Sequence, residues 1–247
     1  MRKVIAVASG KGGVGKTVAS LNIAMALHEM GEDVVIVDAD LNNPAIGLHL
    51  DLFHVPTTIN DVLERDIHIL EALHIHPSGL RVIPSSVSID RLHPNTYKFG
   101  EIFQDLDNYI IVDCAPGFGK EVLSVLEMCD EVLVVTNPNF PAVVGSMRLL
   151  EVAKNMDKKI TGIILNRIGM SDVKDHEIEG ICQEGIIIEV PYDRNVDRSI
   201  ANKMPVVKYR PLSPASIQFQ RAAGKITGKE YVAPRFLRIR RLAQRMR

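Results

Sequence analysis

Seven short runs of apolar and β-branched residues recur along the 247-residue chain. Each run is continuous rather than alternating, as expected for strands that are covered on both faces. The runs are KVIAVAS (3–9), DVVIVDAD (33–40), LRVIPS (80–85), YIIVDCAP (109–116), EVLVVTNP (131–138), ITGIILNR (160–167) and GIIIEVP (185–191). They predict a buried, mainly parallel sheet of about seven to eight strands.

Helix-like stretches lie between most of these runs. In the first stretch, apolar residues such as Leu21, Ala24 and Leu27 fall on one side, as in an amphipathic helix. The predicted helices cover residues 16–30, 119–128, 140–156, 173–183 and 213–226. This alternation of strands and helices favours an α/β fold with a doubly wound sheet in one domain, which we place at residues 1–230.

Charge is distributed unevenly along the chain. The net charge is −1, but residues 235–247 contain six arginines and no acidic residue. Because these arginines contribute +6, residues 1–234 carry −7. A basic segment on an acidic body is typical of a tail with a polyanionic partner, so we separate residues 231–247 as a basic C-terminal tail.

Cysteine usage and hydropathy narrow the class of protein. Cys114, Cys129 and Cys182 are far apart and form no C-x-x-C pair, so the sequence supports neither a zinc site nor an iron–sulfur site. With no secretory signal, the expected compartment is the reducing cytoplasm. No apolar run approaches the roughly 18 residues typical of a transmembrane helix, so no membrane span is expected.

The segment SGKGGVGKTV (9–18) directly follows the first predicted strand. Gly10, Gly15, Lys16 and Thr17 satisfy the pattern G-x-x-x-x-G-K-[ST]. Glycines let backbone N–H groups wrap a phosphate without Cβ clashes, and a helix that starts near Lys16 points its positive dipole end at the same anion. Lys16 would hold the terminal phosphates, and the Thr17 hydroxyl would ligate Mg²⁺. The loop therefore predicts ATP and Mg²⁺ as ligands.

Two carboxylates end the second predicted strand. Asp38 and Asp40, in VVIVDADLNNP, are two residues apart and therefore point to one face. The carboxyl ends of parallel strands are where α/β sheets bind ligands. Carboxylates there can hold the water shell of Mg²⁺ and orient an attacking water. We therefore expect both residues beside the phosphate loop.

The stretch KGGVGKT (11–17) resembles the deviant Walker A loop of the MinD/ParA family of ATPases. The resemblance covers about residues 2–226 and is closest to archaeal MinD-like proteins, notably in PVVKYRPLSPAS (205–216). It implies that ATP is held by nine consecutive residues: Gly10, Lys11, Gly12, Gly13, Val14, Gly15, Lys16, Thr17 and Val18. It also implies that Lys11 reaches across a dimer interface to the partner's nucleotide. A cation donated in this way would offset the repulsion between two facing triphosphates, so ATP would drive a homodimer.

The same resemblance assigns roles to the carboxylates after the second strand. Asp40 would position or activate the attacking water, which makes it a catalytic residue together with Lys11 and Lys16. Asp38 would support the metal. One position departs from the family pattern: Ala45 aligns with an asparagine that MinD proteins usually carry.

Later segments also resemble functional elements of the family. In YIIVDCAPG, Asp113 would hold the metal through water, and the Gly117 N–H would sense the γ-phosphate. In LNR (165–167), the Asn166 amide would read an adenine edge, since it offers both a donor and an acceptor. In VPYD (190–193), Pro191 and Tyr192 would flank the adenine ring.

These features predict a slow Mg-dependent ATPase that forms an ATP-dependent homodimer and acts as a spatial switch, for a cell division site or another cellular structure. An unidentified activating protein would accelerate hydrolysis. Three alternatives remain open. A ParA-like DNA or chromosome partitioning ATPase is the second choice, with DNA as the partner. A metallocluster-insertion ATPase lacks the expected cysteine pair, and a small-molecule kinase would leave Lys11 unexplained.

The tail RFLRIRRLAQRMR (235–247) has a moderate amphipathic pattern. Phe236, Ile239, Leu242, Ala243 and Met246 fall within about 120° of one another on a helical wheel, and most of the arginines lie outside that stripe. A basic amphipathic helix of this kind lies in the headgroup plane of an anionic membrane surface. MinD proteins resemble this chain in using a C-terminal amphipathic helix, so we expect a cytoplasmic protein that is peripheral at the inner face of the cell membrane. A disordered basic extension, or one that binds DNA, is the alternative.

Overall fold

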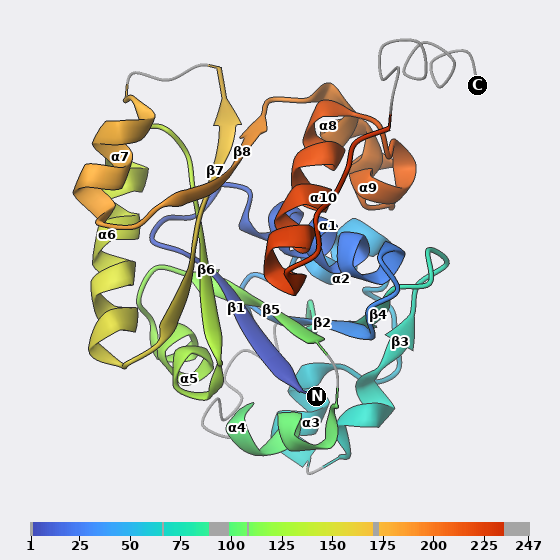
Figure 1. The fold of residues 1–247 in the computed structure, drawn as a ribbon. Coiled ribbons are helices and arrows are strands. Elements are labelled where there is room, and N and C mark those ends of the chain that lie inside the picture. Colours follow the sequence, from blue (N-terminus) through green and yellow to red (C-terminus); the bar gives the residue numbers. More distant parts are fainter. Residues whose placement is uncertain (1, 66, 89–98, 108, 170–172, 235–247) are drawn as a thin grey trace.

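A sheet of eight strands crosses the molecule and carries helices on both faces (Figure 1). The computed structural model describes residues 2–65, 67–88, 99–107, 109–169 and 173–234. The strands are β1 (Lys3–Ser9), β2 (Val34–Ala39), β3 (His74–Ile75), β4 (Arg81–Ile83), β5 (Tyr109–Pro116), β6 (Glu131–Thr136), β7 (Lys159–Ile168) and β8 (Ile186–Pro191). Their order is β3-β4-β2-β5-β1-β6-β7-β8, and every pair of neighbours is parallel except β3 and β4. The predicted doubly wound, mainly parallel α/β sheet is confirmed.

The predicted apolar runs and helical stretches correspond to the main strands and helices of the fold. All seven runs form strands whose ends lie within two residues of the predicted ends. The five predicted helices are α1 (Lys16–Glu29), α5 (Lys120–Met128), α6 (Phe140–Asn155), α7 (Asp175–Cys182) and α10 (Pro214–Thr227). Every residue of β2 and β6 is buried, which explains why those runs are apolar without alternation.

Several short elements were not predicted. They are the edge strand β3, the helices α2 (Ile46–Leu50), α3 (Ile59–Arg65), α4 (Phe99–Ile102), α8 (Arg194–Ala201) and α9 (Val206–Tyr209), and the 3₁₀ turns η1 (Ile69–Ala72) and η4 (Phe103–Asp105). Helices of one or two turns show too few residues for an apolar period to emerge, and tertiary contacts stabilise them. In the described part of the chain, no helix combines the length and the apolar character needed to cross a membrane.

The two faces of the sheet pack against different helices. On β1, Val4 and Ala6 belong to the core shared with α3–α7, whereas Ile5 and Val7 belong to the core shared with α1, α2, α9 and α10. Both layers are visible in Figure 1. This alternation decides where polar side chains at the strand ends point, because each strand presents every second residue to the same layer.

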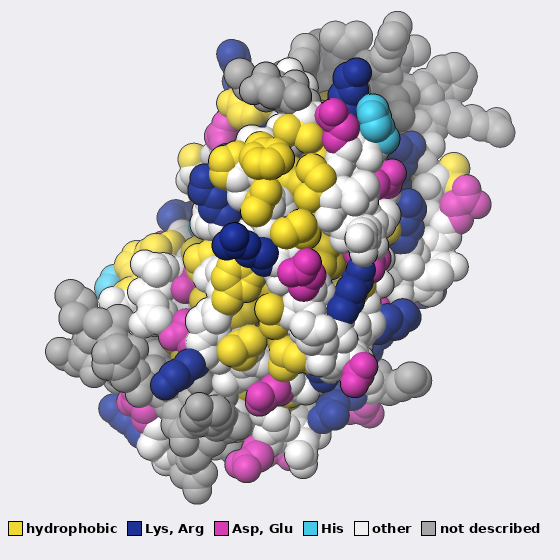
Figure 2. Space-filling view, turned by 90° about the vertical axis from the view of Figure 1, so that its left-hand side faces the viewer, with side chains coloured by type: hydrophobic (Ala, Val, Ile, Leu, Met, Phe, Trp, Pro, Cys, Tyr) yellow, Lys and Arg dark blue, Asp and Glu magenta, His cyan; other side chains and the backbone are white. Residues whose placement is uncertain are grey.

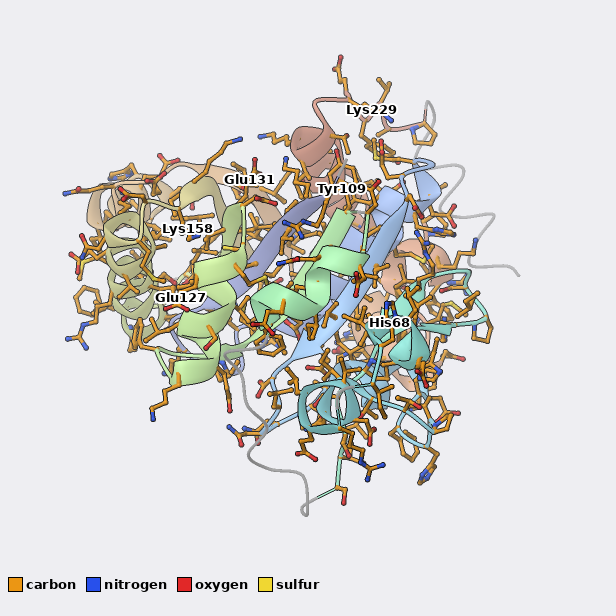
Figure 3. All side chains as sticks on the ribbon, turned by 90° about the horizontal axis from the view of Figure 1, so that it is seen from below. His68, Tyr109, Glu127, Glu131, Lys158 and Lys229 are labelled. Atoms are coloured by element: carbon orange, nitrogen blue, oxygen red, sulfur yellow. The ribbon has the colours of Figure 1, made fainter. Side chains whose placement is uncertain are left out.

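At the amino ends of the strands, Glu131 connects three neighbouring strands. Its carboxylate accepts hydrogen bonds from Lys159 Nζ at 2.5 Å and Thr161 Oγ1 at 2.9 Å, and Lys3 Nζ lies 3.1 Å away. Although burial would raise the pKa of Glu131, these hydrogen bonds lower it. Figure 3 shows this side of the sheet, with Glu131 near Tyr109 and Lys158. The cluster stabilises the edge opposite to the predicted phosphate loop.

Candidate functional site

The phosphate loop connects β1 to α1. Gly13 and Gly15 have φ angles of 79° and 91°, in the left-handed region that glycine tolerates. A Cβ on Gly15 would lie 2.3 Å from Asn166 Nδ2, so the position has no space for a side chain. Helix α1 begins directly at Lys16, where backbone N–H groups have no intrahelical acceptor. Loop and helix therefore form a cradle suited to an anion.

A cavity opens at this cradle. Its lining residues are Ser9, Gly12, Gly13, Gly15, Lys16, Thr17, Val18, Asp40, His49, Pro116 and Arg167. Six of the nine loop residues that were predicted to hold ATP are among them. The other three have different surroundings: Gly10 packs against the backbone of Gly145, Lys11 is exposed, and Val14 is buried. We refer to this space as the phosphate cavity.

Lys16 lines the phosphate cavity and pairs with the buried Asp113. Its Nζ lies 2.9 Å from Asp113 Oδ1, and the Ser20 hydroxyl donates to the same oxygen at 2.9 Å. Lys16 is 7% exposed and Asp113 is fully buried. Burial alone would lower the pKa of Lys16, but the charge and the hydrogen bond of Asp113 outweigh it and raise the pKa. Lys16 is therefore a buried cation at the start of α1, fixed by its contact with Asp113.

Asp38 lies beside Asp113 on the neighbouring strand, at the same register position. Its Oδ2 accepts the backbone N–H groups of Ala45 at 3.0 Å and Ile46 at 2.9 Å, and its Oδ1 accepts that of Asp40 at 3.2 Å. Both carboxylate oxygens are thus engaged in shaping the turn that leads into α2. The geometry adds a loop-forming role to the metal-supporting role predicted for Asp38, which stays a prediction.

Burial and the negative charge of Asp113 raise the pKa of Asp38 to about 7. A carboxyl whose pKa is higher in the folded state than in the unfolded state stabilises the fold most when it is protonated. That stability is fully present below the unfolded pKa, near 4, and is lost as the pH rises through about 7. We therefore expect this group to make the free energy of unfolding fall by about 3 kcal/mol between pH 4.5 and pH 7.5.

The measurement is urea denaturation of wild type and Asp38→Asn across this pH range. The variant loses a backbone hydrogen bond at every pH, so only the slope against pH is diagnostic. We expect a smaller decrease in stability for Asp38→Asn than for wild type. Parallel curves would contradict the raised pKa.

Asp40 lines the phosphate cavity, as the sequence predicted. Its Oδ1 accepts the Asn43 N–H at 3.1 Å, which orients the carboxylate. Burial raises the pKa of Asp40, while the charge of Lys16 opposes that rise. A carboxylate with a raised pKa beside a phosphate site is suited to accept a proton from water. Its catalytic role remains a prediction.

The chemistry of the cavity fits a magnesium ion. Asp113 Oδ2 is buried and has no hydrogen-bond partner in the described part of the chain, so it is an oxygen suited to the water shell of a cation. Thr17 lines the phosphate cavity together with Lys16, the partner of Asp113. Among the described residues, no group of three His, Cys, Asp or Glu side chains could hold a metal alone. A magnesium ion at phosphates does not need such a group, since it keeps water and phosphate ligands.

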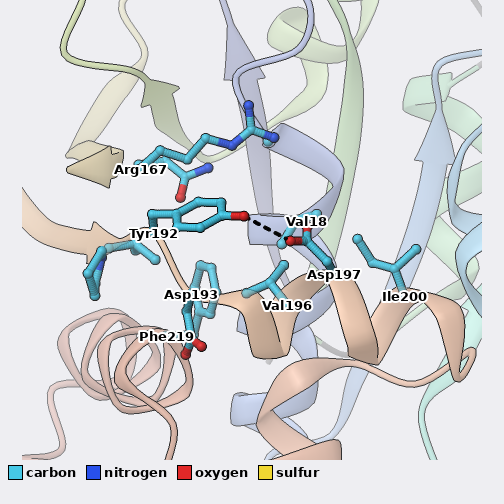
Figure 4. Close-up of a pocket in the computed structure, with 12 residues that line it drawn as sticks. Val18, Arg167, Tyr192, Asp193, Val196, Asp197, Ile200 and Phe219 are labelled. Atoms are coloured by element: carbon cyan, nitrogen blue, oxygen red, sulfur yellow. Dashed lines mark hydrogen bonds between the residues drawn. The ribbon is translucent and has the colours of Figure 1, made fainter. Parts of the chain in front are cut away.

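A second cavity, shown in Figure 4, shares Gly15, Val18 and Arg167 with the phosphate cavity. It is lined by Gly15, Val18, Asn166, Arg167, Val190, Pro191, Tyr192, Asp193, Val196, Asp197, Ile200 and Phe219. The three residues that were predicted to contact adenine therefore come together here, next to the phosphate loop. We refer to this space as the base pocket.

Two predicted contact groups already have partners within the protein. Asn166 Nδ2 donates to the Val14 carbonyl at 2.8 Å, so this amide supports the phosphate loop as well as lining the base pocket. The Gly117 N–H, predicted to sense the γ-phosphate, donates to the Ser9 carbonyl at 2.9 Å. Contact of either donor with a nucleotide requires exchange of these bonds, and both contacts stay predictions.

The sequence did not indicate several residues that line the two cavities. Arg167 belongs to both, has a φ of 58° and donates from Nη1 to the Gly13 carbonyl at 3.2 Å. The only sequence feature that indicated Arg167 was its position directly after Asn166. Val196 and Ile200 come from α8, and His49 comes from α2. They could not be found without those unpredicted helices.

A glycine loop between a strand and a helix, a buried lysine at the helix start and an aspartate on the adjacent strand define this chain as a P-loop NTPase. Comparison with known proteins identifies the family of P-loop NTPases to which the chain belongs. A family model described as ParA, the NUBPL iron-transfer P-loop NTPase, matches residues 1–227. The chain belongs to the ParA family.

Individual proteins are similar to this chain over most of its length, and two of the similar solved structures are archaeal MinD proteins. An uncharacterised ATP-binding protein of Methanocaldococcus jannaschii is 34% identical, covering 94% of this chain and 90% of its own. The cell division ATPase MinD of Pyrococcus furiosus matches with a TM-score of 0.87 and 28% identity, over 92% of this chain and 99% of its own. The septum site-determining protein MinD of Pyrococcus horikoshii, complexed with Mg-ADP, matches with a TM-score of 0.86 and 28% identity, over 92% and 96%.

Proposed function

We propose that this chain is an ATP-dependent switch ATPase of the MinD type, which dimerises with ATP and hydrolyses it to ADP and phosphate. The observation that carries the proposal is the buried pair of Lys16 and Asp113, with Asp38 and Asp40 beside it, at a glycine-rich phosphate cradle. The match to a MinD structure with Mg-ADP supports ATP and Mg²⁺ as ligands.

Four residues at the phosphate cavity have proposed tasks: Lys16, Thr17 and Asp40, which line it, and the buried Asp113. Lys16 binds the terminal phosphates and offsets their charge, which requires that it exchange its contact with Asp113 for a phosphate oxygen. Thr17 and Asp113 would hold a magnesium ion, Asp113 through water. The bound ion would supply positive charge that offsets the charge of the phosphates. Asp40 orients the attacking water and accepts its proton.

In the proposed dimer, Lys11 contacts the nucleotide that is bound to the partner subunit. This residue is exposed on a loop whose neighbours Gly12 and Gly13 are also exposed, so another subunit can reach it. We expect Lys11→Ala to bind ATP, because Lys16 remains, yet to stay monomeric and inactive with ATP. Sedimentation velocity with ATP and with ADP measures the assembly, and phosphate release measures the turnover.

The matched control is Lys225→Ala, which removes an exposed lysine from α10. It should dimerise as wild type does. If Lys11→Ala forms the same ATP-dependent dimer as wild type, Lys11 is an ordinary loop residue and the trans contact is refuted.

We further propose that residues 235–247 bind an anionic membrane surface, which would make the protein peripheral at the inner face of the cell membrane. The tail from residue 235 lies outside the described residues. After α10 the chain turns at Gly228, with φ 71°, and residues 229–234 run back along α10 toward α8 (Figure 1). The last described residues therefore lie near α8, which contributes Val196 and Ile200 to the base pocket.

Removal of the tail is expected to abolish ATP-dependent binding to vesicles. Each arginine near an anionic surface contributes about 1 kcal/mol, and two tails on one dimer gain roughly a hundredfold in avidity. We would compare residues 1–247 with residues 1–233 in co-sedimentation with anionic and zwitterionic vesicles, with ATP and with ADP. Equal sedimentation of both chains, or no effect of ATP, contradicts the anchor.

The full chain and the 1–233 truncation also test the alternative that the tail binds DNA rather than a membrane. A ParA-like partitioning ATPase would bind double-stranded DNA with ATP, with an affinity that falls steeply as salt rises. DNA binding that requires residues 234–247, without vesicle binding, would favour that function.

Iron transfer, which the matched family model names, has less support here. Burial raises the pKa of Cys129 and of Cys182 to about 11, and it also raises the pKa of the Cys114 thiol. All three cysteines are buried, whereas a cluster-transferring protein needs accessible thiolates.

An activating protein has a candidate surface. Figure 2 shows hydrophobic side chains gathered on the side of the molecule that α6 and α7 form. Phe140, at the start of α6, is 62% exposed, and Phe118, two residues after the end of β5, is 40% exposed. Exposed apolar groups of this kind often mark sites of protein interaction, and here they follow strands that end at the nucleotide edge.

A further inference from the structure

The phosphate cavity is lined by residues from several elements besides the glycine loop. The loop side is formed by residues such as Gly13 and Lys16, whereas α2 contributes one residue, His49, to the lining. His49 is half-buried, while the preceding residue, Leu48, is 45% exposed. Because successive helix residues point about 100° apart, an outward Leu48 is consistent with a ring at position 49 that faces the cavity.

Two contacts fix the helix that carries this ring. At its start, Asp38 Oδ2 accepts the N–H groups of Ala45 and Ile46. Near its end, Lys203 Nζ donates to the Leu48 carbonyl at 2.8 Å. Helix α2 is therefore positioned by the carboxylate next to Asp113 on one side and by the segment after α8 on the other. Binding of a ligand to His49 would therefore be coupled to the Asp38 contacts at the start of α2 and to the Lys203 contact near its end.

The His49 ring is chemically available for a ligand. Burial lowers its pKa, so at pH 7 the ring is neutral and presents one N–H donor and one ring-nitrogen acceptor. In the described part of the structure, no hydrogen bond joins either ring nitrogen to another group. The cavity that the ring faces also contains the cation Lys16, the hydroxyl of Thr17 and the carboxylate of Asp40, the groups proposed to surround a triphosphate and its magnesium ion.

We propose that His49 is a nucleotide-binding residue that donates a hydrogen bond to the phosphate chain of the bound nucleotide and so links nucleotide binding to α2. This inference rests on the proposed nucleotide site and adds a residue that the phosphate-loop motif does not include. A neutral ring suits the position because it can donate to a phosphate oxygen without adding a fixed charge beside Lys16.

The test compares ATP and ADP dissociation constants of wild type, His49→Ala and His49→Gln, measured by titration with a fluorescent nucleotide analogue and by competition with unlabelled ATP and ADP. A hydrogen bond to a charged phosphate oxygen is lost in the alanine variant, so we expect its affinity to fall about tenfold. Glutamine restores one donor and one acceptor at a similar reach, so its affinity should stay within about threefold of wild type. Leu48→Ala, on the exposed side of the same helix, is the matched control and should bind as wild type does.

The outcomes separate this inference from the proposed function. A wild-type protein that binds neither nucleotide refutes the proposed function itself. If wild type binds but His49→Ala binds equally well, or if His49→Gln is as weak as His49→Ala, the role of the His49 hydrogen bond is overturned. Should the alanine variant fail to fold, His49→Leu, which keeps the volume but has no donor, replaces it in the comparison with His49→Gln.

Discussion

Replacement of Lys16 by methionine is expected to abolish ATP binding and to lower the free energy of unfolding by about 3 kcal/mol. Lys16 is the cation in the phosphate cavity that is held 2.9 Å from Asp113. Its loss removes the charge that binds the terminal phosphates. It also leaves Asp113 fully buried, with Asp38 as its neighbour on the adjacent strand, so two carboxylates would lie together without a compensating cation. Isothermal titration with Mg-ATP and urea denaturation measure the two effects separately.

The double variant Lys16→Met/Asp113→Asn separates binding from folding. It removes the uncompensated carboxylate, so most of the lost stability should return, while ATP binding should stay absent. The amide oxygen of the substituted side chain can still accept the Ser20 hydroxyl, which bonds to Asp113 in wild type. A double variant that binds ATP would show that Lys16 is not the phosphate-binding cation. A single variant as stable as wild type would refute the energetic importance of the buried pair.

The sheet could be predicted because its strands are covered on both faces. Strands such as β2 and β6 are buried at every position, and a continuous apolar run follows directly from that environment. The edge strand β3 has two residues, of which Ile75 is 71% exposed, so it has neither the length nor the burial that makes a pattern. Helix α2 could not be predicted for a similar reason. It has only five residues, and its start depends on a carboxylate from the end of β2.

The candidate site could be predicted as far as it depends on local chemistry. The spacing of Lys16 and Thr17 after the glycines, and the carboxylates at strand ends, follow rules that hold along a few residues. The partners of these groups come from distant parts of the chain: Asn166 reaches the Val14 carbonyl, and Gly117 reaches Ser9. A motif predicts that a donor is present at a position, but only the fold decides which acceptor it meets.

Gly10 illustrates this difference. The motif explains its glycine by the need to wrap a phosphate without a side chain. In the structure a Cβ at this position would lie 2.0 Å from the carbonyl carbon of Gly145 and 2.1 Å from its oxygen, because the end of β1 packs directly against α6. Real Cβ atoms do not approach backbone atoms closer than 3.0 Å. The glycine is therefore required by packing against a helix about 135 residues later in the chain, and the sequence alone could not reveal that neighbour.

Gly10→Ala is accordingly expected to destabilise the fold by about 3 kcal/mol or more, since α6 and the phosphate loop must move apart to accept a methyl group against backbone. Gly12→Ala is the matched control within the same loop. Its Cβ would meet only Pro116 side-chain atoms at 3.9 Å, so its free energy of unfolding should stay within about 1 kcal/mol of wild type. Gly145→Ala should fall between them, because its Cβ would lie 3.0 Å from the Gly10 oxygen, a distance that a small shift can relieve. Urea denaturation of the three variants without nucleotide gives the order directly. If Gly10→Ala is as stable as Gly12→Ala, the close packing of β1 against α6 does not constrain the loop, and the phosphate-wrapping explanation of Gly10 is sufficient.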